Sequence, residues 1–126
     1  MLTSYRELHV WKQSLVLVSQ VYRITGKLPA AERFGLTAQM RRAAVSVPCN
    51  IAEGYGRATR GEYLNQLSVA RGSLNEVEAL CEVCTTLELL EEGDLRLVSK
   101  ALADVRRMLG RLREALKKTS SPRRRS

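Results

Sequence analysis

Residues 41–57 read RRAAVSVPCNIAEGYGR, which is the pattern of a helix that contains a proline and is closed by two glycines. At helical spacing, one side of this segment is apolar and the opposite side is polar. The apolar side consists of Met40, Ala44, Val47, Ile51 and Tyr55, and the polar side of Arg42, Ser46, Asn50, Glu53 and Arg57. The segment therefore predicts a core-facing helix whose outer side carries a distinctive set of polar groups.

Three more helices are predicted by apolar residues that recur every three or four positions. Together with residues 36–55, the expected helices cover about residues 5–25, 60–90 and 94–118. The expected breaks between them are marked by Gly26 and Pro29, by Gly54 and Gly56, and by Gly93. Capping boxes are expected at Ser4 with Glu7 and at Thr59 with Glu62, and Asp94 is expected as the N-cap of the last helix.

The last expected helix has the most regular amphipathic pattern. Its apolar residues alternate at spacings of three and four: Leu95, Val98, Leu102, Val105, Leu109, Leu112 and Leu116. Four helices joined by short links predict an all-α, up-down-up-down four-helix bundle. A single domain over residues 1–118 is large enough to bury a core, and residues 119–126 are expected to form a disordered basic tail.

The first and third expected helices carry more apolar residues than one bundle core needs. In the first helix, one stripe comprises Leu8, Trp11, Leu15, Val18 and Tyr22, and a second comprises Val10, Leu17, Val21, Ile24 and Leu28. A monomer that exposed the surplus would present a large apolar patch, so self-association is expected. The expected interface residues are Val10, Leu17, Val21, Leu80, Val83 and Leu87. The alternative is a broad apolar arc inside a wide intramolecular core.

Bulk composition excludes several classes of protein. The longest aliphatic run, residues 15–18, is far too short to span a membrane or to form the core of a signal peptide, so no membrane association is expected. Three cysteines, an odd number, argue against a secreted disulfide framework. A cytoplasmic location is therefore expected.

Cysteine and histidine are too few for metal or catalytic chemistry. Cys81 and Cys84 have a C-x-x-C spacing, but on a helix both thiols would face the core, and only Cys49 and His9 remain as further ligands. A single histidine also leaves no di-iron set and no Ser/His/Asp set. The sequence therefore predicts no metal, no cofactor and no enzymatic activity.

The polar side of residues 41–57 is expected to be architectural. Pro48 lacks a backbone amide and should bend the helix, so nearby polar groups are needed to satisfy the freed carbonyl. The residues expected to form this structural motif are Ser46, Pro48, Asn50, Glu53 and Gly54. Glu53 can also pair with Arg57, four residues on, and a catalytic role for Glu53 lacks partner residues.

Charge is distributed unevenly along the chain, whose net charge is +8. Residues 76–95 hold seven acids and no Lys or Arg, whereas the last expected helix and the tail are strongly basic. Such a basic surface attracts the phosphates of RNA or DNA. The expected nucleic-acid-binding residues are Arg41, Arg42, Arg106, Arg107, Arg111, Arg113, Lys117, Lys118, Arg123, Arg124 and Arg125. Since no Phe, Tyr or Trp is interleaved with these arginines, a base-stacking surface is not expected.

Two alternatives to nucleic-acid binding remain open. The basic residues could form a solvated face that confers solubility, or the protein could be a structural scaffold whose basic surface binds an acidic protein partner. Either alternative would leave binding to nucleic acid absent even at low salt.

Four stretches together resemble the 23S rRNA intervening-sequence proteins, a four-helix-bundle family. They are residues 5–11 (YRELHVW), 36–48 (LTAQMRRAAVSVP), 50–54 (NIAEG) and 70–76 (ARGSLNE), and the likeness covers about residues 4–116. Cys49 stands where this family usually has a small serine. The family is similar to the accessory variability determinant of diversity-generating retroelements. This resemblance implies a basic homopentamer without catalytic activity that works with RNA or RNA/DNA and with a reverse transcriptase.

Overall fold

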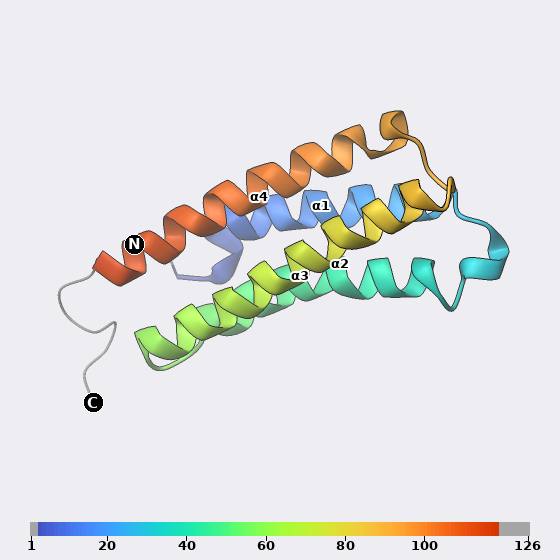
Figure 1. The fold of residues 1–126 in the computed structure, drawn as a ribbon. Coiled ribbons are helices and arrows are strands. Elements are labelled where there is room, and N and C mark those ends of the chain that lie inside the picture. The colour runs from blue at the N-terminus through green and yellow to red at the C-terminus, as the bar shows by residue number, and fades with distance from the viewer. Residues whose placement is uncertain (1–2, 119–126) are drawn as a thin grey trace.

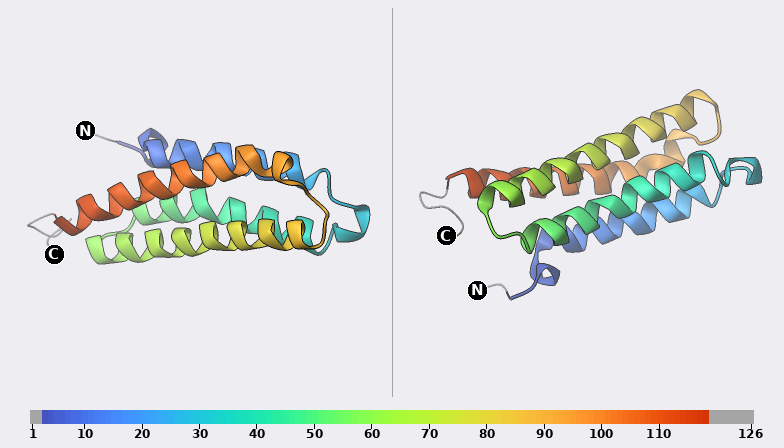
Figure 2. Two further views of the ribbon diagram at one scale, coloured as in Figure 1. Left: turned by 45° about the horizontal axis from the view of Figure 1, so that its top comes forward. Right: turned by 90° about the horizontal axis from the view of Figure 1, so that it is seen from below.

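The computed structural model describes residues 3–118 and shows four helices packed as a bundle (Figure 1). The helices are α1 (His9–Thr25), α2 (Leu36–Tyr55), α3 (Arg60–Thr86) and α4 (Glu92–Lys118), and two short 3-10 turns cover Tyr5–Glu7 and Ala30–Glu32. Each helix packs against the next in sequence, and α4 returns to pack against α1, as the two views of Figure 2 also show. This confirms the predicted all-α bundle; the predicted tail at 119–126 lies outside the described residues.

The core lies along the axis between the four helices, and every helix contributes to it. The predicted apolar side of α2 is confirmed, because Met40, Ala44, Val47 and Ile51 are fully buried. The regular stripe of α4 is buried as far as Leu109. Burial of apolar residues from all four helices stabilises this arrangement.

The helix boundaries differ from the expected ones at two places. Residues 5–7 form a separate 3-10 turn capped by Ser4, and α1 begins only at His9 because the backbone of Leu8 is extended. At the other end of the bundle, α3 ends at Thr86, and Glu88 adopts the left-handed conformation with φ of 60°. That backbone turn ends α3 a few residues earlier than expected.

Gly93 and Asp94 were wrongly placed by the sequence prediction. Gly93 lies inside the first turn of α4, so the break is made by residues 87–91 and not by this glycine. Asp94 is not the N-cap, because its Oδ2 accepts a hydrogen bond from the N–H of Glu91 at 2.9 Å, which lies before the helix. The carboxylate thus reaches back from the third helical position, as in a capping box.

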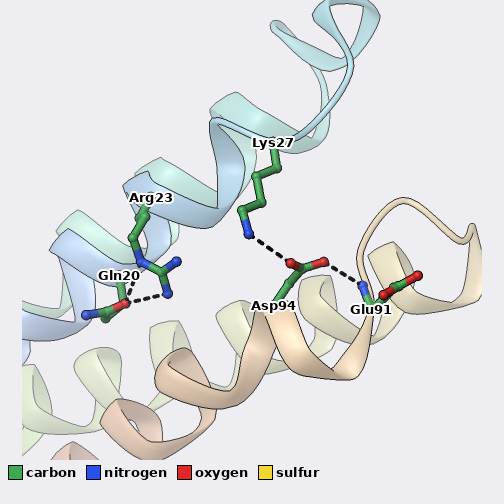
Figure 3. A network of polar contacts seen from close by, with 5 residues as sticks. All are labelled: Gln20, Arg23, Lys27, Glu91 and Asp94. Atoms are coloured by element: carbon green, nitrogen blue, oxygen red, sulfur yellow. Dashed lines mark hydrogen bonds and ion pairs between the residues drawn. The ribbon is translucent and has the colours of Figure 1, made fainter.

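A network of polar contacts ties the start of α4 to the end of α1 (Figure 3). Lys27 Nζ donates to Asp94 Oδ1 at 2.9 Å, while the other carboxylate oxygen accepts the Glu91 amide. The hydrogen bond from that amide is the main cause of a lowered pKa at Asp94, and the bond from Lys27 adds to it. Both contacts are stronger with the ionised carboxylate than with the neutral acid.

The pH dependence of folding should report this network. A carboxylate whose pKa is lowered on folding stabilises the protein above its unfolded-state pKa of about 4, and this contribution is lost as the pH falls through the folded-state pKa. Urea unfolding at pH 7 and at pH 3 should therefore show a larger loss of stability for the natural protein than for Asp94→Asn. Glu76→Gln, which changes an exposed acid on α3, is the control. Equal pH dependence of Asp94→Asn and the natural protein would contradict this assignment.

From the polar side of α2, Ser46 contacts α3. Ser46 and Ser73 share a hydrogen bond of 2.7 Å between their hydroxyls, and Asn50 Nδ2 donates to the carbonyl and the hydroxyl of Ser46 at 2.7 and 2.8 Å. The helix continues through Pro48 to Tyr55. Asn50 therefore donates to the carbonyl of Ser46. The expected acceptor was the carbonyl freed by Pro48, which is that of Ala44, four residues before the proline.

The surplus apolar residues were in part wrongly assigned. Val10, Leu17, Val21 and Leu80 are at most 7% exposed and belong to the core of the single bundle, so they are not available to a second copy. Val83 and Leu87 are 41% and 55% exposed, as an interface would need. The reason is the orientation of α1. The stripe of Val10 points into the core, so the stripe of Trp11 and Leu15 lies at the edge of the core, in a surface groove beside α2.

Candidate nucleic-acid interface

The cationic residues of α4 fall into two groups according to which way they face. Arg106 is turned towards α3, where it donates to Asn75 Oδ1 at 2.7 Å and forms an ion pair with Glu78 at 2.9 Å. Arg113 also reaches α3 and donates to Ser68 Oγ at 3.1 Å, and its Nε is buried without a hydrogen-bond partner. These two arginines brace the seam between α3 and α4.

The second group reaches solvent on the outer side of α4, although Arg107 also lines the cleft between α3 and α4. Arg107, Arg111 and Lys118 are exposed and line a shallow cavity of about 630 Å³ on α4 together with Gly110, Arg113, Glu114 and Ala115. Arg107 is held by Asp104 at 3.1 Å, whereas Arg111 and Lys118 have no ion pair within residues 3–118. Lys117 lies 3.8 Å from Glu114. This outward face presents accessible positive charge.

Arg41 does not belong to this surface. Its guanidinium donates to Thr25 Oγ1 at 2.8 Å and to the carbonyl of Tyr22 at 3.3 Å, and it lies over the Tyr22 ring at 4.3 Å from the centroid. Arg41 thus clamps the end of α1 and is engaged in the fold. Arg42 is exposed on α2 and does not line the cavity that holds Arg107, Arg111 and Lys118.

The two ends of the bundle differ in charge. The last turns of α4 lie at the same end as the first turn of α1 and the loop between α2 and α3, which carries Arg57 (Figure 1). Arg57 is paired with Glu53 at 2.7 Å, as one of the sequence interpretations expected. The acidic residues of the α3–α4 turn lie at the opposite end. The arginines Arg123, Arg124 and Arg125, also expected in the interface, lie outside the described residues.

An apolar groove between α1 and α2 was not predicted as a site. It has a volume of about 290 Å³, and its wall from α1 and the preceding turn is aromatic and aliphatic. The lining residues are Tyr5, Trp11, Leu15, Val18, Val45, Pro48, Cys49 and Ala52. The sequence signal for this groove was the first apolar stripe of α1, which the interface prediction set aside in favour of the second.

The paired cysteines behave as packing residues, as expected. Cys81 and Cys84 are both buried, and Cys84 Sγ lies 3.7 Å from Met40 Sδ. Burial is the main cause that raises the pKa of Cys81 to about 12, so its thiol stays protonated at neutral pH. Within the described part of the chain, no three His, Cys, Asp or Glu residues are grouped so that they could hold a metal ion.

Comparison with known proteins identifies the family. A sequence profile described as 23S rRNA-intervening sequence protein matches residues 6–111. The chain belongs to this family. The match spans α1, α2, α3 and most of α4, so family membership covers the groove between α1 and α2 and the outward face of α4 as far as Arg111.

Solved structures agree with the family assignment at the level of the fold. A crystal structure of a protein of unknown function from the S23 ribosomal protein family of Bacteroides thetaiotaomicron matches with a TM-score of 0.76. The match covers 83% of this chain and 98% of that chain at 20% sequence identity, which shows a shared fold alone. No curated protein shows significant similarity to the sequence. Over residues 3–118, none of the helices is both long and apolar enough to cross a membrane.

Proposed function

We propose that this protein is a non-catalytic accessory factor that binds RNA or DNA electrostatically through the outward face of α4 and acts as an oligomer. The observation that carries the proposal is the cluster of Arg107, Arg111 and Lys118 around one solvent-open cavity. Phosphate contacts of this kind supply affinity without reading sequence. A retroelement reverse transcriptase is one candidate protein partner, and it rests on the sequence resemblance alone.

The oligomer is supported by the groove between α1 and α2. Exposed apolar residues that lie next to one another are candidate contacts for a second copy, and this groove carries Trp11 together with Leu15, which is 42% exposed. The groove replaces Val10, Leu17, Val21 and Leu80 as the proposed contact surface, while Val83 and Leu87 remain candidates on α3. Five copies is the number that the resemblance implies. Several copies would place several basic faces along one polyanion.

Binding across a salt series tests the nucleic-acid part of the proposal. The affinity for a 20-nucleotide single strand and for a 20-base-pair duplex is measured from about 25 to 300 mM salt, where each phosphate contact contributes about 0.7 to 0.9 to the slope of log affinity against log salt. Replacing Arg107, Arg111 and Lys118 with glutamine should reduce that slope by about two to three. Arg23→Gln, near the opposite end of α1, is the control. An undetectable affinity at 25 mM salt would overturn the proposal and favour an acidic protein partner.

A further inference from the structure

A second small pocket lies where the beginning of α1 meets the last third of α4. Its volume is about 310 Å³, which is at the lower end of the range for small-molecule sites. The walls are apolar and consist of Leu8, Val10, Met108 and Leu112. Two side chains that line the same pocket, His9 and Arg111, are exposed to solvent. A flat apolar group that carries polar edges fits such a site.

Arg111 belongs both to this pocket and to the outward face of α4. It lines the pocket on one side of the helix and also lines the cavity that holds Arg107 and Lys118. A ligand with an apolar ring and a phosphate close to it would therefore contact both places through one arginine. A nucleotide unit of a nucleic-acid strand has this combination of parts.

We propose that the pocket between α1 and α4 receives one unpaired base of a single-stranded nucleic acid, while Arg111 binds the phosphate beside it. This inference rests on the proposed function and names its ligand more closely. The ring of His9 provides a surface for stacking, and the apolar walls replace the neighbouring bases of the stack. A base within a duplex is paired and stacked, so it cannot enter without being extruded.

Two further hollows fit this ligand less well. The cleft between α3 and α4, of about 440 Å³, is lined by Glu78 and Glu82 as well as by Arg106 and Arg107, so the carboxylates offset the positive charge that a phosphate would need. The groove between α1 and α2 has no charged residue in its lining, so nothing there would hold a phosphate. The pocket at His9 combines an apolar interior with Arg111, a cation of the outward face of α4.

The position of His9 in the chain explains why a base-stacking surface was not predicted from the sequence. His9 lies about 100 positions before Arg107 and Arg111, and no Phe, Tyr or Trp stands between the arginines of α4. The antiparallel packing of α1 against α4 places the first turn of one helix beside the last turns of the other. The two halves of the proposed site are therefore neighbours only in the folded protein.

Three ligands with the same number of phosphates per strand test the inference on the full-length protein. They are a 20-nucleotide oligo(dT), an abasic 20-mer with the same backbone, and a 20-base-pair DNA duplex. At low salt we expect oligo(dT) to bind about tenfold more tightly than the abasic strand, because stacking adds to the phosphate contacts. Equal affinity for oligo(dT) and the abasic strand would overturn the inference and leave the proposed function standing. Absence of binding by all three would overturn the proposed function itself.

Two single substitutions locate the effect. His9→Ala removes the stacking ring and Met108→Ala removes part of the wall, so each should lower the affinity for oligo(dT) about five- to tenfold and leave the affinity for the abasic strand unchanged. Leu97→Ala, which changes an exposed apolar residue of α4 outside the pocket, is the control. Unchanged oligo(dT) binding in both pocket variants, or a changed oligomeric state without a change in selectivity, would contradict the assignment of this pocket.

Discussion

Replacing Gly54 with leucine is expected to destabilise the bundle by about 3 kcal/mol, a large part of the total stability of a domain of this size. Gly54 is buried where α2 crosses α3, and a Cβ added there would lie 2.9 Å from the Tyr63 ring and 3.0 Å from Gln66 Cβ. Tyr63 is itself 2% exposed and packs edge-on against Tyr55, so it has little space to move. The free energy of unfolding by urea, at one fixed protein concentration, gives the measurement.

Gly72→Ala is the matched control for that experiment. Gly72 is also inside a helix, but a Cβ there meets nothing within 4 Å, so alanine should stabilise the protein by about 1 kcal/mol through helix propensity alone. Gly54→Ala gains the same stability from helix propensity, but the close contact of its Cβ with Tyr63 costs more stability than that. The difference in unfolding free energy between the two alanine variants therefore reports packing at Gly54. If Gly54→Ala were as stable as Gly72→Ala, the close approach of α2 and α3 would be wrong.

Leu15→Asp is expected to convert the proposed oligomer to monomers at micromolar concentration. Leu15 lies in the groove between α1 and α2, and a carboxylate buried there by a second copy would have no partner. A loss of at least about 2 kcal/mol, or about thirtyfold in the association constant, is typical of an interface anchor. Because the side chain is 42% exposed in the single bundle, the helical content should be unchanged.

Val16→Asp controls for the charge and for the helix position. Val16 is 43% exposed on the same helix, but it does not line the groove, so its variant should keep the oligomeric state of the natural protein. Light scattering after gel filtration compares the two. Affinity for a long single strand should fall together with oligomeric state in Leu15→Asp, since several linked basic faces bind more tightly than one. An oligomer that survives Leu15→Asp would show that copies meet elsewhere.

The pattern of apolar residues was sufficient to predict the fold. Periodicity placed all four helices, and the core side of α2 is the one that Met40, Val47 and Ile51 indicated. The errors lie at the helix ends, where a single left-handed residue, Glu88, decided the break that Gly93 was expected to make. Local backbone conformation of this kind leaves no periodic signal in a sequence.

The candidate site could be predicted only in part. The sequence identified α4 as the basic helix, but it could not show that Arg106 and Arg113 turn towards α3 while Arg107 and Arg111 turn outward. Arg41 was counted as a free cation although the fold uses it to clamp the end of α1. Which partner a long side chain finds depends on the neighbouring helix, and that neighbour is set by packing.

The sequence by itself determined the helices, the family and the separation of charge between the two ends of the bundle, since each of these depends on residues close together in the chain. Only the tertiary structure decided which stripe of α1 is buried. Val10 and Trp11 belong to stripes of similar hydrophobicity, and the rotation of α1 against its neighbours buries the stripe of Val10 and leaves the stripe of Trp11 only partly buried. It also placed His9 beside Arg111, because antiparallel packing joins residues that the chain keeps far apart.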